Sequence, residues 1–387
     1  MLLGREPKDF DVTTDARPEE IRQLFRNCRL IGRRFRLAHI HFGRHIIEVA
    51  TFRALQADED VEGRLIENGR IIRDNVYGTI EEDAWRRDFT VNAIYYNFAD
   101  FGVVDYVRGV DDLKAGVLRL IGDPEVRYRE DPVRMLRAVR FAVKLGFRMH
   151  EGTEAPLNTL APLLAGISPA RLYEEVLKLF LGGTALQTLE ALRHYALFEH
   201  LFPATERCLN EERQGQCLAL LTHALANTDT RIGEGKPVTP AFLYAALLWG
   251  PVRARTAQLQ AQGTSEATSL QQAAREIFQD QSRHAILPRR FATQMREIWL
   301  LQPRLQRSSP KRAARLLEHP RFRAAYDFLL LRAQAGEEVR EMAEWWTRYQ
   351  QADATQRETI LAQPAVQAPG NPPRRRRRRR RRRAVQA

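Results

Sequence analysis

Two aspartates near the start of the chain are spaced to hold a metal ion. Asp9 and Asp11 lie two residues apart in the run PKDFDVTT. On an extended segment such side chains project to the same face, where two carboxylates repel each other unless a cation lies between them. Hard oxygen ligands of this kind suit Mg²⁺, and a pair of such ions can clamp the oxygens of a phosphoryl transfer. The same spacing is common in surface turns, so the pair alone does not distinguish a metal site from a turn.

A third acid, Glu48, lies between apolar neighbours in the run IIEV. A carboxylate on a mostly apolar strand is costly to bury unless it is paired or bound to a metal. If its strand lies beside the segment of Asp9 and Asp11, Glu48 is a third metal-binding acid. The alternative is a strand whose polar face is simply solvated.

The run RRDFTVN, residues 86–92, combines the groups that a nucleotide needs. The planar fork of an arginine such as Arg87 matches phosphate oxygens. Asp88 and Asn92 could contact a ribose or the edge of a base. A solvated helix end would have a similar composition.

A second arginine-rich run, REDPVRMLRAVRF, covers residues 129–141. Asp131 followed by proline predicts a helix start, with the aspartate as N-cap. Arg134 and Arg137 are three residues apart and therefore share one helix face. We expect Asp131 to orient Arg134 while both arginines face a nucleotide. A capped surface helix with ion pairs is the alternative.

Other reactive side chains carry less information. His39 and His41 alternate on an expected strand, and we interpret them as structural or substrate-facing, not metal-binding. Cys28, Cys208 and Cys217 are scattered, odd in number and without metal-ligand spacing, which indicates reduced thiols in a cytoplasmic protein. The sequence has neither a signal-peptide pattern nor a run of ~20 apolar residues that could span a membrane.

The elements that must position these residues are strands first and helices after, which is an α+β arrangement. We expect a helix beginning near Pro18 and an exposed polar loop over 54–70. Helices should begin at Asp131-Pro132 and Ser168-Pro169. The predicted strands cover 37–42, 46–52 and 102–106, and helices should continue to 362 with breaks near Pro203, Pro237–Pro240, Pro288 and Pro320.

The net charge of +13 comes mainly from one segment. Ten arginines run unbroken from Arg374 to Arg383; the remaining 51 Lys and Arg nearly balance 48 acids. Such a block repels itself and stays disordered until it meets a polyanion, either nucleic acid or an anionic membrane surface. We favour nucleic acid over a membrane surface or no specific role.

Taken in order, these motifs resemble the bacterial poly(A) polymerases of the class II nucleotidyltransferase family, which share a DNA polymerase beta-like palm with the CCA-adding tRNA nucleotidyltransferases. The resemblance runs from Leu2 to about residue 200, weakens, and returns around LLEHPRFRAAYD at 316–327. It implies a palm domain over 1–122, a helical neck for base recognition over 123–200, a helical RNA-binding body over 201–362, and a Pro-rich linker with a disordered poly-Arg tail over 363–387. The basic run GRRFRLAHI favours poly(A) polymerase over a CCA-adding enzyme.

The resemblance also implies roles. Template-independent transfer of AMP from ATP to RNA 3′ ends would use Mg²⁺ held by Asp9, Asp11 and Glu48, with Asp9, Asp11 and Asp88 as the catalytic acids. The residues implied to bind the nucleotide are Arg87, Asn92, Asp131, Arg134 and Arg137. Arginine and glutamate of the run SPARLYEE at 168–175 would stabilise the helix that reads the base. RNA-decay proteins are candidate partners, and a monomer is favoured.

One departure from the family pattern affects the expected activity. In the family, a glycine-rich turn ending in Val-Arg-Asp precedes the Leu-Leu-Gly that opens this sequence, and its N–H groups cradle the triphosphate. We therefore expect residues 1–387 as written to be weakly active or inactive. The competing functions are a CCA-adding tRNA nucleotidyltransferase and a non-catalytic RNA-binding remnant.

Overall fold

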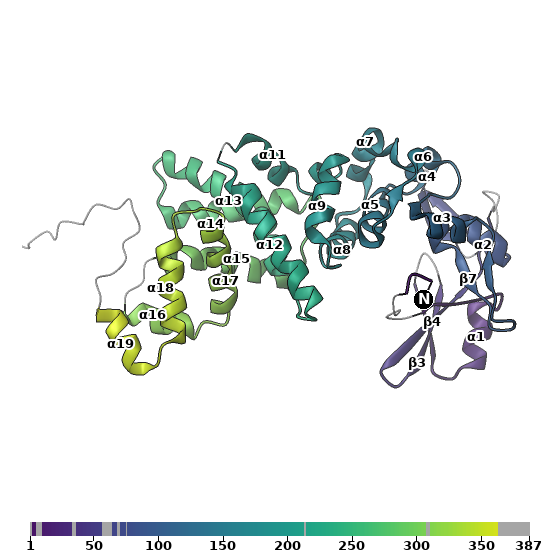
Figure 1. The fold of residues 1–387 in the computed structure, drawn as a ribbon, viewed down its shortest axis with the longest axis horizontal. Coiled ribbons are helices and arrows are strands. Elements are labelled where there is room, and N and C mark those ends of the chain that lie inside the picture. The colour runs from purple at the N-terminus through teal and green to yellow at the C-terminus, as the bar shows by residue number, and fades with distance from the viewer. Residues whose placement is uncertain are drawn as a thin grey trace, which may run out of the picture. The chain divides into compact units, whose positions relative to one another are not determined.

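The computed structural model describes residues 2–4, 10–32, 36–55, 64–67, 70–74, 76–212, 214–306 and 310–362. Asp9 and the predicted linker and tail lie outside these ranges. The chain forms two compact units, which are described separately. The first holds the residues up to Pro203 with Thr228–Lys236 and Ser282–Ile286, and the second holds Ala204–Asn227, Pro237–Gln281 and Leu287 onward. Figure 1 labels many of their elements.

The first unit begins with a small mixed sheet. Its strands have the order β1-β4-β3-β2, with β1 parallel to β4 and the other pairs antiparallel. Three short two-stranded pairs complete the set, which comprises β1 (Val12–Thr14), β2 (Cys28–Ile31), β3 (Leu37–Phe42), β4 (His45–Thr51), β5 (Arg64–Glu67), β6 (Arg70–Asp74), β7 (Ile94–Tyr96), β8 (Val103–Asp105), β9 (Val117–Leu118) and β10 (Arg148–Met149).

Helices follow the sheet. Those of the first unit are α1 (Pro18–Leu24), α2 (Ile80–Arg86), α3 (Gly109–Ala115), α4 (Pro124–Glu130), α5 (Val133–Leu145), α6 (Glu151–Glu154), α7 (Leu157–Leu160), α8 (Pro169–Phe180), α9 (Ala185–His194) and α10 (Phe198–Leu201), with 3₁₀ turns η1 (Thr90–Asn92) and η2 (Ala161–Gly166). Strands before helices confirm the predicted α+β class.

The two faces of the sheet have different characters. Helix α1 covers one face, where Ile21 packs with Ala38, Ile40 and Val49 in a small apolar core. Because side chains alternate along a strand, the residues between these positions project to the opposite face. That second face is therefore available to a functional site.

Most predicted elements of the first unit are present, and one prediction is wrong. Strand β3 has the predicted bounds, and β4 is displaced by one residue. The exposed loop expected over 54–70 instead contains strand β5 and the start of β6, which pair antiparallel. A loop was predicted because residues 58–62 are acidic. The apolar residues of RLIE and RIIRD, with Asn-Gly between them, are a strong hairpin signal that indicates the observed structure.

The second unit is helical. Helices with most of their residues in it are α11 (Pro203–Glu211), α12 (Gln216–Gly233), α13 (Pro240–Ala261), α14 (Glu266–Gln281), α15 (Arg289–Gln306), α16 (Pro310–Leu317), α17 (Phe322–Gln334), α18 (Arg340–Gln351) and α19 (Ala354–Ala362). Helices begin at or just after each predicted proline break, since proline suits a first helical turn. Pro251 of α13 and Pro303 of α15 lie inside helices, so not every proline of this unit ends one.

Helix α13 is the centre of this unit. Nearly every residue from Ala241 to Val252 is buried, so the first half of α13 has no polar face. A helix that is apolar on all sides must be covered on all sides. Helices α14 and α15 pack against it, and Trp299 of α15 donates its indole N–H to the carbonyl of Ala245.

A buried ion pair ties α17 to the rest of this core. Arg332 donates to Glu337 at 2.8 Å, and both side chains are only 8% exposed. Arg332 also donates to Gln302 Oε1 of α15 at 3.0 Å, while Glu337 accepts from Trp249 Nε1 of α13 at 2.8 Å. Each buried charge is therefore paired and hydrogen-bonded, which offsets the cost of removing it from water.

Within the described ranges, no helix is long and apolar enough to cross a membrane.

Replacing Arg332 with alanine should destabilise the chain by about 3 kcal/mol, because buried Glu337 would lose its hydrogen-bonded cation and keep only Arg253, whose Nη1 lies 3.8 Å away. Urea unfolding followed by circular dichroism measures this change. Arg323 on the same helix is the matched control: its side chain is 73% exposed in its ion pair with Asp327. Arg323→Ala should change the free energy of unfolding by less than about 1 kcal/mol. Equal effects of the two substitutions would contradict the assignment.

Candidate active site

A pocket of about 620 Å³ in the first unit gathers most of the predicted site residues. It is bordered by the end of β4, by the segment from α2 through η1, and by the facing sides of α5 and α8. The polar side chains that line it are Arg53, Asp83, Arg86, Arg87, Asp88, Asn92, Asp131, Arg134, Arg137, Arg171 and Glu175. The fold thus brings together the two arginine-rich runs that lie about 40 residues apart in the sequence.

Asp88 is the most deeply buried of the described acids that were predicted to be catalytic or to bind the nucleotide. Its Oδ2 accepts from Arg137 Nε at 2.5 Å, and its Oδ1 accepts from Asn92 Nδ2 at 3.1 Å. Burial alone would raise the pKa of Asp88, but the Arg137 guanidinium and these hydrogen bonds outweigh burial and hold that pKa below its ordinary value. Asp88 is therefore a carboxylate at neutral pH.

Arg87 is held in place by two residues that the sequence motifs did not single out. Its Nε and Nη2 donate to Asp83 Oδ2 at 3.1 Å, and Tyr95 donates its hydroxyl hydrogen to the same oxygen at 2.8 Å. The Asp83 side chain is only 12% exposed. Asp83 precedes Arg87 by four residues, and this i,i+4 spacing could have predicted their ion pair from the sequence. Nothing in the local sequence predicts that Tyr95 contacts Asp83.

The start of α5 differs from the expected arrangement. Helix α5 begins at Val133 with Pro132 as its N-cap residue, so Asp131 lies one residue before the N-cap position predicted for it. Its carboxylate still accepts from the N–H of Val133 at 3.3 Å. Its other oxygen accepts from Arg171 Nη2 of α8 at 2.6 Å. Arg134 instead donates to Glu130 Oε2 at 2.8 Å, so Glu130, not Asp131, orients it. The carboxylate of Asp131 is already engaged by Arg171 and the helix N-terminus, whereas Glu130 is four residues before Arg134.

Glu175 forms the far wall of the pocket and is almost completely buried. It accepts from Lys178 Nζ at 2.8 Å, and its second oxygen lies 4.0 Å from Arg140 Nε without a hydrogen bond. Burial is the main reason that the pKa of Arg140 is lowered. Helix α8 thus supplies an arginine and a glutamate behind α5, as the run SPARLYEE predicted.

Two of the predicted metal ligands, Asp11 and Glu48, lie at the sheet beside this pocket. Asp11 is exposed and immediately precedes Val12, whose register partner on β4 is Val49, the residue after Glu48. Val12 and Val49 both pack on the α1 side, so alternation places Asp11 and Glu48 on the opposite face with Ala50, which lines the pocket. Glu48 Oε1 lies 3.0 Å from His39 Nε2.

This pair of carboxylates fits a Mg²⁺ ion by its chemistry. Asp11 and Glu48 offer oxygen ligands at adjacent register positions, and Glu48 is 46% exposed, so an ion and its waters can reach it. Asp9 cannot be placed because it is outside the described residues. The residues present are therefore compatible with a metal next to the pocket.

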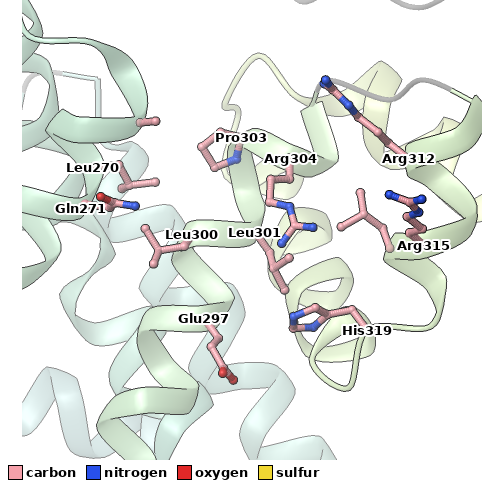
Figure 2. Close-up of a pocket in the computed structure, with 12 residues that line it drawn as sticks. Leu270, Gln271, Glu297, Leu300, Leu301, Pro303, Arg304, Arg312, Arg315 and His319 are labelled. Carbon is pink, nitrogen blue, oxygen red and sulfur yellow. The ribbon is translucent and has the colours of Figure 1, made fainter.

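A second, more apolar pocket of about 690 Å³ lies in the second unit, between α14, α15 and α16. Leucines form its floor, and Arg304, Arg312, Arg315 and His319 surround it. In Figure 2, Arg304 and Arg315 point into the space between α15 and α16, with His319 beside them. Among the described residues, no acid forms an ion pair with Arg304, Arg312 or Arg315. Glu297 is the one acid among the lining residues that the structure describes, and it pairs with Arg321 at 3.4 Å. The pocket therefore carries a net positive charge.

Three protein-family models match the chain. They are the poly A polymerase head domain over residues 1–119, the probable RNA and SrmB-binding site of polymerase A over 146–209, and the polymerase A arginine-rich C-terminus over 262–383.

Whole-sequence relatives agree with these matches. Poly(A) polymerase I of Escherichia coli O6:H1 is 51% identical over 358 residues, which cover 90% of this chain and 77% of the relative. Poly(A) polymerase I of Haemophilus influenzae is 48% identical, covering 93% and 81%. A CCA-adding enzyme of Lactobacillus helveticus is 36% identical over 190 residues, covering only 49% and 46%.

Solved structures share the fold. The CCA-adding enzyme of Bacillus stearothermophilus in complex with CTP superposes with a TM-score of 0.58 at 24% identity, covering 94% of this chain and 82% of that one. The Thermotoga maritima CCA-adding enzyme complexed with tRNA gives 0.56 at 19% identity, covering 94% and 80%. At this identity the likeness establishes the fold alone.

Replacing Arg137 with methionine should raise the pKa of Asp88, because burial would no longer be opposed by the guanidinium. In the native chain the folded pKa lies below the unfolded value, so the pair stabilises the fold above about pH 4 and this contribution is lost as pH falls through the folded pKa. Carbon-13 NMR titration of the aspartate carboxyls measures the shift. Arg129→Met, at an exposed position on α4, is the control. An unchanged Asp88 pKa in Arg137→Met would contradict the assignment.

Proposed function

Since the chain belongs to the poly(A) polymerase family and is a polynucleotide adenylyltransferase, we propose that the pocket around Asp88 binds ATP and that AMP is transferred from it to RNA 3′ ends without a template. The 51% identity to a poly(A) polymerase I over 90% of the chain carries this proposal. The charge and the hydrogen-bonding groups of the pocket support it.

The arginines of the pocket suit a triphosphate. Arg53, Arg86 and Arg87 border it on the sheet side and Arg137 on the helix side. A guanidinium presents paired N–H donors that match phosphate oxygens. Asp83 and Tyr95 fix the orientation of Arg87 before the nucleotide arrives, which lowers the entropy lost on binding.

Asp131 and Arg134 suit the edge of adenine. A carboxylate accepts from the exocyclic amino group, and a guanidinium donates to the adjacent ring nitrogen. Guanine and uracil present the reverse pattern, a carbonyl beside an N–H, and would leave both protein groups unpaired. Cytosine shares the donor and acceptor order of adenine, so the size of the pocket must exclude it. Arg171 holds the Asp131 carboxylate in position for this role.

Asp11 and Glu48, together with Asp9, would hold Mg²⁺. When bound, the metal supplies Lewis-acid activation of the primer hydroxyl and neutralises the triphosphate. Asp88, kept ionised by Arg137, would accept a hydrogen bond from the RNA 3′-hydroxyl and orient its oxygen toward the α-phosphate. Attack by that oxygen joins AMP to the RNA and releases pyrophosphate.

The RNA upstream of its 3′ end would be held by the second unit. The charged pocket of Arg304, Arg312 and Arg315 is suited to the phosphates of a single strand, and its leucines can contact a base. The arginine tail would add to this binding. A cytoplasmic location, a monomeric state and contact with RNA-decay proteins stay predictions.

The function is tested by extension of a 5′-labelled oligo(A) RNA with Mg²⁺ and each nucleotide separately. ATP should give A additions, a weak ladder if the glycine-rich turn is required as expected above, and GTP and UTP should give none. Asp88→Asn should reduce the rate by about 100-fold or more, because one positioned group of this kind is commonly worth that much. Arg129→Ala is the control and should retain the rate. Three additions to a tRNA lacking its 3′ end, followed by a stop, would instead identify a CCA-adding enzyme.

The RNA path is tested by the salt dependence of binding. The double substitution Arg312→Gln and Arg315→Gln should flatten the slope of log K against log salt by about 0.7 for each phosphate that the protein no longer neutralises. Filter binding of labelled oligo(A) between about 50 and 200 mM salt measures this slope. Arg275→Gln, an exposed arginine of α14 outside the pocket, is the control. A slope equal to that of the control would place the RNA elsewhere.

A further inference from the structure

Two of the three cysteines lie side by side in the second unit, although their spacing in the sequence indicated three scattered thiols. Cys208 is on α11, and Cys217, nine residues later, is the second residue of α12. Their Sγ atoms and a carboxylate oxygen of Glu212 all lie within 4.8 Å of one another. Within the described residues this is the one group of three metal-ligating side chains so close together. The arrangement plays no part in the proposed transfer reaction.

The sulfur atoms pack directly on the backbone of α13. A Cβ built on Gly250 would lie 2.3 Å from Cys217 Sγ and 2.9 Å from Cys208 Sγ, so a larger residue at this position would force the two thiols to move. No side chain of α13 therefore separates the two thiols. Cys217 is 4% exposed, whereas Cys208 is half-buried and can be reached from solvent.

The surrounding charges favour thiol chemistry over a metal ion. Glu212 accepts from Arg253 and from the backbone N–H of Cys217, so its carboxylate is already paired. A divalent cation would have to displace the guanidinium. The hydrogen bond from the Cys217 thiol lowers the pKa of Cys208, and the same bond together with burial raises the pKa of Cys217. The accessible sulfur is thus the one that ionises first.

We propose that Cys208 and Cys217 are a redox-active pair that closes a reversible disulfide between α11 and α12. The inference rests on the contact between the two sulfurs, the glycine beside them and the paired state of Glu212. It is independent of the transfer reaction proposed above.

The oxidant is a small-molecule disulfide. The Cys208 thiolate attacks one of its sulfurs, forms a mixed disulfide and releases one thiolate. Cys217 then loses its proton and attacks the Cys208 sulfur, which closes the protein disulfide and expels the second thiolate. Two protein thiols have lost two protons and two electrons, and the small disulfide has been reduced to two thiols. Excess reduced thiol reverses both steps.

The test is oxidation of the intact chain with glutathione disulfide, followed by alkylation and tryptic mapping. Trypsin cleaves after Arg213, between the two cysteines, so the disulfide joins the peptides 208–213 and 214–231. We expect this linked species, a drop from three alkylated cysteines to one, with Cys28 still alkylated, and full recovery after reductant.

Two variants sharpen the test. In Cys217→Ser, the mixed disulfide on Cys208 cannot be resolved, and we expect a persistent glutathione adduct on the 208–213 peptide. In Cys28→Ser, the linked species should form as in the natural chain. Glutathione adducts on both cysteines without a linked peptide would overturn the proposal. So would protection of both thiols by equimolar Zn²⁺ with no linked peptide after oxidant, which would identify a metal site.

Discussion

The ion pair between Asp88 and Arg137 is the constraint on which the active site depends. It joins a residue after α2 to a residue of α5, 49 positions apart in the sequence, and its acid is only 13% exposed. A second pair, Asp131 with Arg171, joins the turn before α5 to α8 across 40 positions. A buried charge without its partner is strongly unfavourable. The segment after α2, α5 and α8 must therefore meet in one arrangement.

The same pairs prepare the pocket for an anion. Arg87, Arg134 and Arg137 each donate to an acid of the chain, so their guanidinium groups are already oriented. A triphosphate that enters can share donors that these acids leave free, and a guanidinium has five N–H groups. The acids thus limit rotamer freedom without neutralising the pocket, because arginines outnumber acids on its walls.

Local patterns in the sequence predicted elements well and partners poorly. Strand β3 and the starts of α8 and α13 follow from alternation and from proline, which act over a few residues. The site residues Arg87, Asp88, Asn92, Asp131, Arg134 and Arg137 were identified by side-chain chemistry and family resemblance, and they line one pocket. The role of Tyr95 as a partner of Asp83 and Arg87, and the meeting of Cys208 with Cys217, depend on tertiary contacts. The hairpin of β5 and β6 was not predicted, because the acidic residues before it made the whole segment 54–70 resemble an exposed loop.

Helix α13 has a consequence for synthesis of the chain on the ribosome. Its apolar first half is covered mainly by α14, α15 and α17, all of which are translated after it. Until those helices emerge, the nascent chain presents a helix with no polar face, which favours aggregation or chaperone binding. A chain stalled just after Ala261 should therefore be more aggregation-prone than one stalled after Leu361. Because α13 is translated before the helices that cover it, the helix at the centre of the folded second unit is its most exposed part during translation.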